Sequence, residues 1–234
     1  SLLPIAFASA CVSVLALPAR AADMAFTTVR YDVDRSCRAD CLRVMQASGQ
    51  ITKDTPKAFL EFARREIDRP GLIHVLLLHS PGGSVNASMA LGRALRKLGT
   101  VVIVARAMDP SVPAERTPRR RSRLEDQVRF MSGTCASACV YTLAGGAKRV
   151  VPAQSRIAVH RMAGNIGFVD PATREYQNRR IYAGEEELNA LTAYIHDMGV
   201  STELVGIAES VPHEHARVLD TRDLSRLRLA APKL

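Results

Sequence analysis

The chain has 234 residues, of which 47% are hydrophobic and 24% charged, and its formal net charge is +9 at pH 7. This composition excludes a disordered or collagen-like chain and supplies enough apolar residues for one sizeable core, so we expect one compact domain. Much of the positive charge lies in the run from Arg116 to Arg123, but no aromatic residues alternate with it, so nucleic-acid binding is not indicated.

The first segment predicts export. Residues 1–17 carry no charge, and Pro18-Ala19-Arg20-Ala21 ends in the Ala-x-Ala pattern that signal peptidases cut. A membrane anchor is the alternative, but the stretch is shorter than the about 20 apolar residues that span a bilayer. We therefore expect a signal peptide over 1–21 and a periplasmic or secreted chain over 22–234, with membrane contact only through an uncleaved signal segment.

The elements after this segment alternate between strands and helices. An edge strand is predicted over 26–34, a helix over 55–67, a buried strand over 73–79, a helix over 84–98 that Gly99 closes, and a strand over 101–105. Residues 107–127 hold three prolines and the basic run, and predict a long surface loop. A solvated loop is preferred there over a contact with an anionic surface.

The alternation resumes after the loop. Strands are predicted over 127–131, 148–151 and 156–160, a small-residue helix over 136–144, a long helix over 171–198, and a short helix with a strand-like tail over 216–229. Such alternation predicts an α/β fold with a mostly parallel sheet and right-handed crossovers.

Four cysteines outside the first segment form two Cys-x-x-x-Cys pairs, Cys37 with Cys41 and Cys135 with Cys139. An even count suits disulfides in an oxidising compartment, and three pairings stay open. Zinc is the alternative reading, but the His residues show no companion ligand spacing, so no metal or other cofactor is expected.

Three features carry candidate chemistry. Gly82 and Gly83 follow a buried strand and precede a helix, where backbone amides can hold an oxyanion, although a plain tight turn has the same pattern. Ser137 lies among small residues where a strand gives way to a helix, and the amide of Ala138 follows it; the alternative is a tightly packed helix. His160 ends an apolar strand, where it is either structural or a general base for Ser137.

These features together resemble the proteolytic subunit of Clp protease and its periplasmic relatives. The matching residues are Ser80-Pro81-Gly82-Gly83, Ala136-Ser137-Ala138, Gly146-Ala147 with Arg149 and Pro152, and His160, over residues 73–162. The resemblance implies a Clp-protease/crotonase-like fold of stacked ββα units. It also implies Ser137 as nucleophile, His160 as base, and Gly82, Gly83 and Ala138 as oxyanion and substrate-binding residues.

The family's third catalytic residue, an Asp about fifty residues after the His, is missing. The corresponding region reads Ile207-Ala-Glu-Ser-Val-Pro-His213 and offers Glu209 as the candidate acid. A Ser–Lys pair with Lys148 is an alternative, although Lys148 belongs more naturally to a turn. The helix over 171–198 resembles the handle through which Clp-type subunits stack, which implies a homo-oligomer, while its charged residues fit a solvated face equally well.

Three functions follow as hypotheses. The first is an exported serine hydrolase, a peptidase acting on a polypeptide or peptide through Ser137 and His160. The second is an inactive Clp-like module that binds peptides or assembles, motivated by the missing acid. The third is a crotonase-type acyl-thioester enzyme, which export disfavours because coenzyme A is not supplied there.

Overall fold

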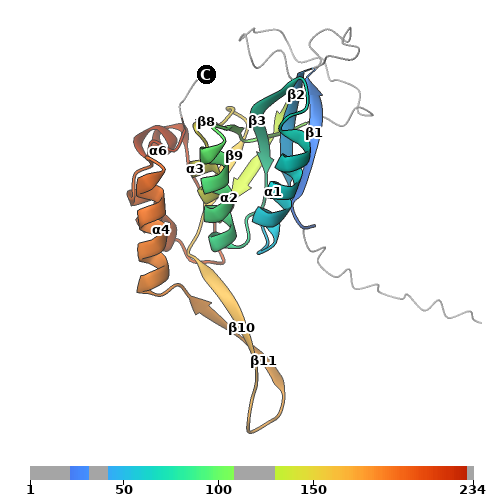
Figure 1. The fold of residues 1–234 in the computed structure, drawn as a ribbon. Helices are drawn as coiled ribbons and strands as arrows, with labels where there is room; N and C mark the ends of the chain where they lie inside the picture. Colours follow the sequence, from blue (N-terminus) through green and yellow to red (C-terminus); the bar gives the residue numbers. More distant parts are fainter. Residues whose placement is uncertain (1–21, 32–41, 108–129, 231–234) are drawn as a thin grey trace, which may run out of the picture.

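A computed structural model describes residues 22–31, 42–107 and 130–230 of the protein (Figure 1). The predicted signal segment, Cys37, Cys41 and nearly all of the predicted basic loop lie outside the described residues. In the part that is described, no helix is long and apolar enough to cross a membrane.

A five-stranded sheet in the order β1-β2-β3-β4-β8 forms the centre of the molecule. β2, β3, β4 and β8 run parallel, and β1 is antiparallel to β2 at one edge. The strands are β1 (Ala25–Tyr31), β2 (Leu42–Ser48), β3 (Leu72–His79), β4 (Val101–Ile103) and β8 (Lys148–Val150). The predicted α/β fold with a mostly parallel sheet is therefore confirmed.

Side chains of the central strand alternate between the two faces of this sheet. Leu76 and Leu78 of β3 pack into the main core, whereas Leu77 packs into a smaller cluster on the opposite face. Two helices, α1 (Thr55–Glu66) and α2 (Val85–Lys97), cover the main-core face side by side (Figure 1). Because β3 is buried on both faces, it reads in the sequence as a continuous apolar run.

A second sheet of three short strands, in the order β12-β9-β7, joins the end of β3. Its strands are β7 (Thr134–Ala136), β9 (Arg156–Val159) and β12 (Arg217–Val218); β7 and β9 are parallel, and β12 is antiparallel to β9. A bridge between Ser80 and Cys135 connects the two sheets. This sheet therefore carries the segments of Ser137 and His160 to the glycines that follow β3.

Several predicted elements differ from the structure in this region. The predicted helix over 136–144 begins only at Cys139 (α3, Cys139–Ala144), because the residues before Ser137 belong to β7. The predicted strand over 101–105 is divided into β4 and β5 (Ala105–Ala107), and β5 pairs with β6 (Phe130–Ser132) in a separate two-stranded sheet. The sequence pattern does not predict β2.

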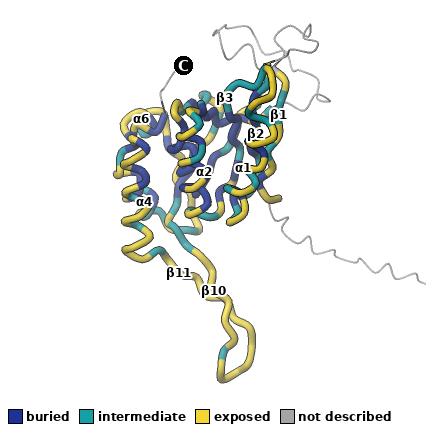
Figure 2. The backbone as a smooth tube through the Cα atoms, in the orientation of Figure 1, coloured by how far each residue is buried: buried dark blue, intermediate teal, exposed yellow. Residues whose placement is uncertain are grey.

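The predicted long helix over 171–198 is wrong in its first half. Its first residues belong to a β-hairpin that starts earlier, with β10 (Ala163–Val169) and β11 (Tyr176–Tyr182) as its strands. Only α4 (Glu185–Asp197) is helical within the predicted range. Asp170 explains the difference, because its carboxylate accepts hydrogen bonds from the amides of Ala172 and Thr173 and closes the hairpin tip. The hairpin projects from the body and is exposed along most of its length (Figure 2).

The C-terminal part packs against the side of the molecule. It contains α4, α5 (Glu203–Glu209) and α6 (Thr221–Arg226), so the predicted strand-like tail is reduced to β12. The hydroxyl of Tyr194 on α4 donates to the carbonyl of Tyr141 on α3 at 2.7 Å. That ring occupies the space that Gly92 on α2 leaves, since a Cβ at position 92 would lie 1.9 Å from the hydroxyl oxygen of Tyr194.

Candidate active site

Ser137 lies in a tight turn between β7 and α3. Its φ is 54°, a left-handed conformation that is uncommon for a residue other than glycine. The turn is held because the amide of Ser137 donates to the carbonyl of Ala158 on β9 at 2.8 Å. Ser137 is half-buried, so part of this rigidly held residue remains accessible. Strained backbone of this kind is typical of functional sites.

A disulfide bond between Cys135 and Cys139 closes the same turn. Both cysteines are fully buried, and the three residues between them include Ser137. Of the pairings that the sequence left open, the structure thus contains Cys135 with Cys139, while Cys37 and Cys41 lie outside the described residues. The disulfide is a covalent constraint on the backbone that positions Ser137.

Gly82 packs directly against Ser137. A Cβ at position 82 would lie 2.6 Å from the carbonyl oxygen of Ala136, 2.8 Å from Cβ of Ser137 and 3.1 Å from the amide nitrogen of Ala138. The φ of Gly82 is 105°, so both its conformation and its close contacts require glycine. The structure therefore brings the loop after β3 into contact with the turn of Ser137, which lies far from it in the sequence.

The backbone amides beside Ser137 differ in their partners. The amide of Gly82 donates to the hydroxyl of Ser80 at 3.1 Å, which makes it a poor candidate for binding an oxyanion. The amides of Gly83 and Ala138 have no hydrogen-bond acceptor among the described residues. The amide of Ala138, which directly follows Ser137, is therefore free to bind a negatively charged oxygen, and Gly83 is the residue after Gly82, the glycine that contacts Ser137.

His160 follows β9, two residues after the carbonyl that holds Ser137. Its Nδ1 lies 3.0 Å from the carbonyl oxygen of Arg161. A carbonyl can only accept a hydrogen bond, so this contact favours the tautomer with the proton on Nδ1. The Nε2 atom of His160 then has a free lone pair, as a general base requires.

A second histidine, His213, contacts His160. The two rings meet edge to face with centroids 4.5 Å apart, and Nδ1 of His213 lies 3.2 Å from the same carbonyl of Arg161. Sequence reasoning missed His213, although it lies in the segment that was searched for an acid. The signal for it is a polar side chain in the segment 207–213, where only a carboxylate was expected.

Glu209 has other partners than His160. Its carboxylate accepts a hydrogen bond from the amide of Met162 at 2.9 Å and forms an ion pair with Arg161, with 3.4 Å between Oε2 and Nε. In the described part of the chain, no carboxylate contacts the ring of His160. Glu209 therefore fixes the segment that follows His160, and the atom facing Nδ1 of His160 is a carbonyl oxygen in place of the expected acid.

Burial shifts the pKa of two further groups, His79 and Tyr141, in the direction that favours the neutral form. Burial, with a smaller effect of Arg106, lowers the pKa of His79, whose Nδ1 accepts a hydrogen bond from the amide of Thr134 at 2.9 Å. Burial, with a smaller effect of Glu209, raises the pKa of Tyr141. Lys148 is exposed on β8, which belongs to the other sheet, so the structure gives no support to a Ser–Lys pair.

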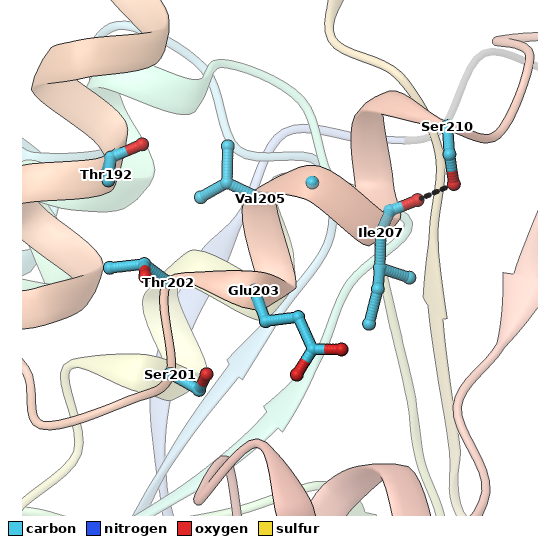
Figure 3. Close-up of a pocket in the computed structure, with 8 residues that line it drawn as sticks. Thr192, Ser201, Thr202, Glu203, Val205, Ile207 and Ser210 are labelled. Carbon is cyan, nitrogen blue, oxygen red and sulfur yellow. Dashed lines mark hydrogen bonds between the residues drawn. The ribbon is translucent and has the colours of Figure 1, made fainter.

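A separate pocket of about 600 Å³ lies between α4 and α5 (Figure 3). It is lined by Thr192, Ser201, Thr202, Glu203, Val205, Gly206, Ile207 and Ser210. Neither Ser137 nor His160 lines it, and its carboxylate, Glu203, pairs with Arg226. The pocket is an open surface depression that is unrelated to the turn of Ser137.

The described residues define an α/β protein in which the turn of Ser137 lies against Gly82 and is hydrogen-bonded to the strand that leads to His160. No family model and no curated protein matches the chain. Among solved structures, it is similar to a mutant of the 1510-N membrane-bound stomatin-specific protease, with 17% identity, a TM-score of 0.48, and coverage of 81% of this chain and 78% of that chain. Another mutant of the same protease was solved in complex with a substrate peptide; there the identity is 15%, the TM-score 0.45, and the coverage 81% and 74%.

A second group of similar structures consists of ClpP proteases. A mutant of ClpP1 from Listeria monocytogenes has 14% identity and a TM-score of 0.42, with coverage of 77% of this chain and 84% of that chain. The ClpP protease catalytic domain from Plasmodium falciparum has 14% identity and a TM-score of 0.41, with coverage of 77% and 78%.

Proposed function

We propose that the protein is an exported serine hydrolase that cleaves peptide bonds. The observation that carries the proposal is the turn of Ser137, in which a half-buried serine with a left-handed backbone packs against Gly82 and is followed by the free amide of Ala138. Such a turn costs about 1–3 kcal/mol and persists only where the surrounding structure maintains it. A serine whose position is fixed, next to backbone amides that are free to donate hydrogen bonds, suits nucleophilic catalysis.

The reaction follows from these positions. The hydroxyl oxygen of Ser137 attacks the carbonyl carbon of a peptide bond, and Nε2 of His160 accepts the hydroxyl proton. The amides of Gly83 and Ala138 donate to the oxygen that becomes negative. His160 then gives the proton to the departing amine. A water molecule next attacks the acyl group while His160 accepts a proton from the water, and His160 returns that proton to the oxygen of Ser137 as the acid leaves.

The missing acid sets the expected rate. A carbonyl oxygen orients the ring of His160 but stabilises its protonated form less than a carboxylate does, and in other serine enzymes loss of the acid lowers kcat about 10⁴-fold. We therefore expect slow turnover, and a reagent that reacts once with the serine is the better test.

The first measurement is labelling of the purified protein with a fluorophosphonate, which phosphonylates an activated serine. The wild type is expected to be labelled, Ser137→Ala not at all, and His160→Ala at least about 100-fold more slowly, as loss of a general base predicts. A folded wild-type protein that stays unlabelled would overturn the hydrolase proposal. The absence of a carboxylate at His160 would then favour the second candidate, an inactive peptide-binding module.

The disulfide beside Ser137 supports a second prediction. Replacing both Cys135 and Cys139 by alanine is expected to slow labelling of Ser137 about tenfold, because the left-handed turn then lacks its covalent constraint. The same variant should lose about 2 kcal/mol of unfolding free energy, because a disulfide that closes so short a loop restricts the unfolded chain less than one that closes a long loop. Labelling kinetics and urea denaturation measure both, and an unchanged labelling rate would contradict this role.

We also propose export, on the signal-peptide pattern over residues 1–21 and on the cysteine pairs. A disulfide in a core position is stable in an oxidising compartment and rare in the cytosol. Mass mapping of the protein isolated from its source under non-reducing conditions, together with its N-terminal residue, tests both points. Cys135 and Cys139 recovered as free thiols would contradict this proposal.

A further inference from the structure

Two interactions hold the ring of His160 in the described part of the chain, a hydrogen bond and a ring contact. The hydrogen bond joins its Nδ1 to the carbonyl oxygen of Arg161, the next residue, at 3.0 Å. The ring contact is with His213, which meets His160 edge to face with 4.5 Å between the ring centroids. Of these two interactions, only the ring contact comes from a distant part of the chain.

The segment that carries His213 is fastened to the segment that carries the candidate base. The amide of Arg161 donates to the carbonyl of Val211 at 2.8 Å, and the amide of Met162 donates to Oε1 of Glu209 at 2.9 Å. The Glu209 carboxylate also forms an ion pair with Arg161. Backbone and side-chain bonds therefore fix where His213 lies relative to the residues that follow β9.

The two histidine rings share one hydrogen-bond acceptor. Nδ1 of His213 lies 3.2 Å from the carbonyl oxygen of Arg161, to which Nδ1 of His160 is also bonded. A carbonyl oxygen has two lone pairs, so it can accept both bonds at once. Each ring must then carry its proton on Nδ1, which leaves Nε2 of His160 with a free lone pair. Rotation of the His160 ring would break its hydrogen bond and the contact with His213 together.

We propose that His213 is a positioning residue, which holds the ring of His160 through the edge-to-face contact so that Nδ1 stays on the Arg161 carbonyl and Nε2 stays free. Its consequence for catalysis rests on the proposed function. A ring that is already in place loses little freedom when it accepts the proton of Ser137, which lowers the barrier of that step. A ring and a carbonyl thereby fill the orienting role for which a carboxylate was expected.

The alternative is that His213 is itself the base. The amide of Ser137 donates to the carbonyl of Ala158 on β9, and His160 follows two residues later on the same strand path. His213 reaches this region only from the segment after α5. The connection of the serine turn to β9 therefore favours His160 as the base and His213 as its support.

A double-mutant cycle of fluorophosphonate labelling tests this role. His213→Ala is expected to lower the maximal labelling rate of Ser137 about tenfold, the scale of losing an aromatic contact and the alignment it provides. The reagent concentration that gives half of this rate should stay the same. In a His160→Ala background the same change should have no effect, because there is no ring to hold.

Two outcomes of this cycle would overturn the proposal. Equal slowing by His213→Ala in both backgrounds would show that His213 acts on the fold and not through His160. Slower labelling of His213→Ala than of His160→Ala would make His213 the base. His215→Ala is the matched control, since this exposed histidine lies two residues further along and should label at the wild-type rate.

Conservative variants separate the ring of His213 from its hydrogen bond. His213→Phe keeps an aromatic ring without the donor, and should label within about twofold of the wild type. His213→Asn keeps an N–H donor near the position of Nδ1 without the ring, and should label as slowly as His213→Ala. Rescue by asparagine and not by phenylalanine would contradict the ring contact as the cause.

Nuclear magnetic resonance of the His160 ring nitrogens gives a readout that does not depend on activity. In mildly alkaline solution, where imidazoles are neutral, the wild type should carry the His160 proton on Nδ1. His213→Ala should show both tautomers, and His213→Phe should match the wild type. An unchanged His160 ring in His213→Ala would overturn the positioning role, whereas a folded wild type that stays unlabelled would overturn the proposed function alone.

Discussion

Replacing Gly82 by alanine is expected to slow fluorophosphonate labelling of Ser137 at least about 100-fold, the loss that follows when an oxyanion donor is removed. The added methyl group would lie 2.6 Å from the carbonyl oxygen of Ala136 and 2.8 Å from Cβ of Ser137. Neither atom can give way without moving the turn. The variant therefore displaces the nucleophile and the neighbouring amide of Gly83 together.

A matched control separates this effect from general destabilisation. Gly49 also has a positive φ, 123°, and a Cβ there would lie 2.6 Å from a backbone carbonyl oxygen, that of Asp23. Gly49→Ala should therefore lose stability to a similar degree while the folded fraction keeps its labelling rate. Rates are compared per folded molecule, from circular dichroism of the same samples. Equal labelling rates for Gly82→Ala and Gly49→Ala would show that Gly82 has no role at the site.

Arg149→Met is expected to destabilise the protein by about 3–5 kcal/mol. The guanidinium of Arg149 donates to five carbonyl oxygens: Ala144 and Gly146 near the end of α3, Met198 at the end of α4, and Arg228 and Leu229 after α6. Arg96 shares two of these acceptors, so methionine would leave the other three without a donor. Gly146 and Leu229 are buried, so their carbonyls would lose a charged donor without gaining water, whereas the carbonyl of the exposed Arg228 can bond water instead.

Lys148→Met is the control for this variant. Lys148 precedes Arg149 on β8 but is exposed, so its replacement by the same residue should change stability by less than about 0.5 kcal/mol. Urea denaturation of both variants gives the comparison. A loss below about 1 kcal/mol for Arg149→Met would show that water satisfies these carbonyls.

The sequence predicts the elements whose signals are local. β3 follows from its apolar run between glycines, and α2 from the helical spacing that Ser84 begins, with its hydroxyl accepting from the amide of Ala87 at 3.3 Å. The sequence also predicts that Gly82 and Ser137 lie together, and the structure places them in contact, while a shared site with His160 stays a prediction. In each of these segments the spacing of apolar residues, or a turn residue beside them, is enough to indicate the element.

The sequence does not predict features that depend on contacts between side chains and distant or neighbouring backbone groups. Pro171 resembles the start of a helix in the sequence, whereas the side chain of Asp170 makes it part of a hairpin tip. The contact of His160 with His213 depends on how α5 ends, and no spacing rule predicts it. The amide of Gly82 is occupied because it donates to the hydroxyl of Ser80, which a linear pattern does not indicate. Each of these requires knowledge of where a side chain points.

The contacts of Arg149 also determine when the protein can fold. Its partners Arg228 and Leu229 lie 79 and 80 residues further along the chain, and the side chains of Leu227 and Leu229 are fully buried in the main core. A nascent chain that lacks residues 227–230 therefore leaves both a hole in its core and a guanidinium without these acceptors. Folding is completed only after this segment has been synthesised, and until then the incomplete core exposes apolar surface to other molecules.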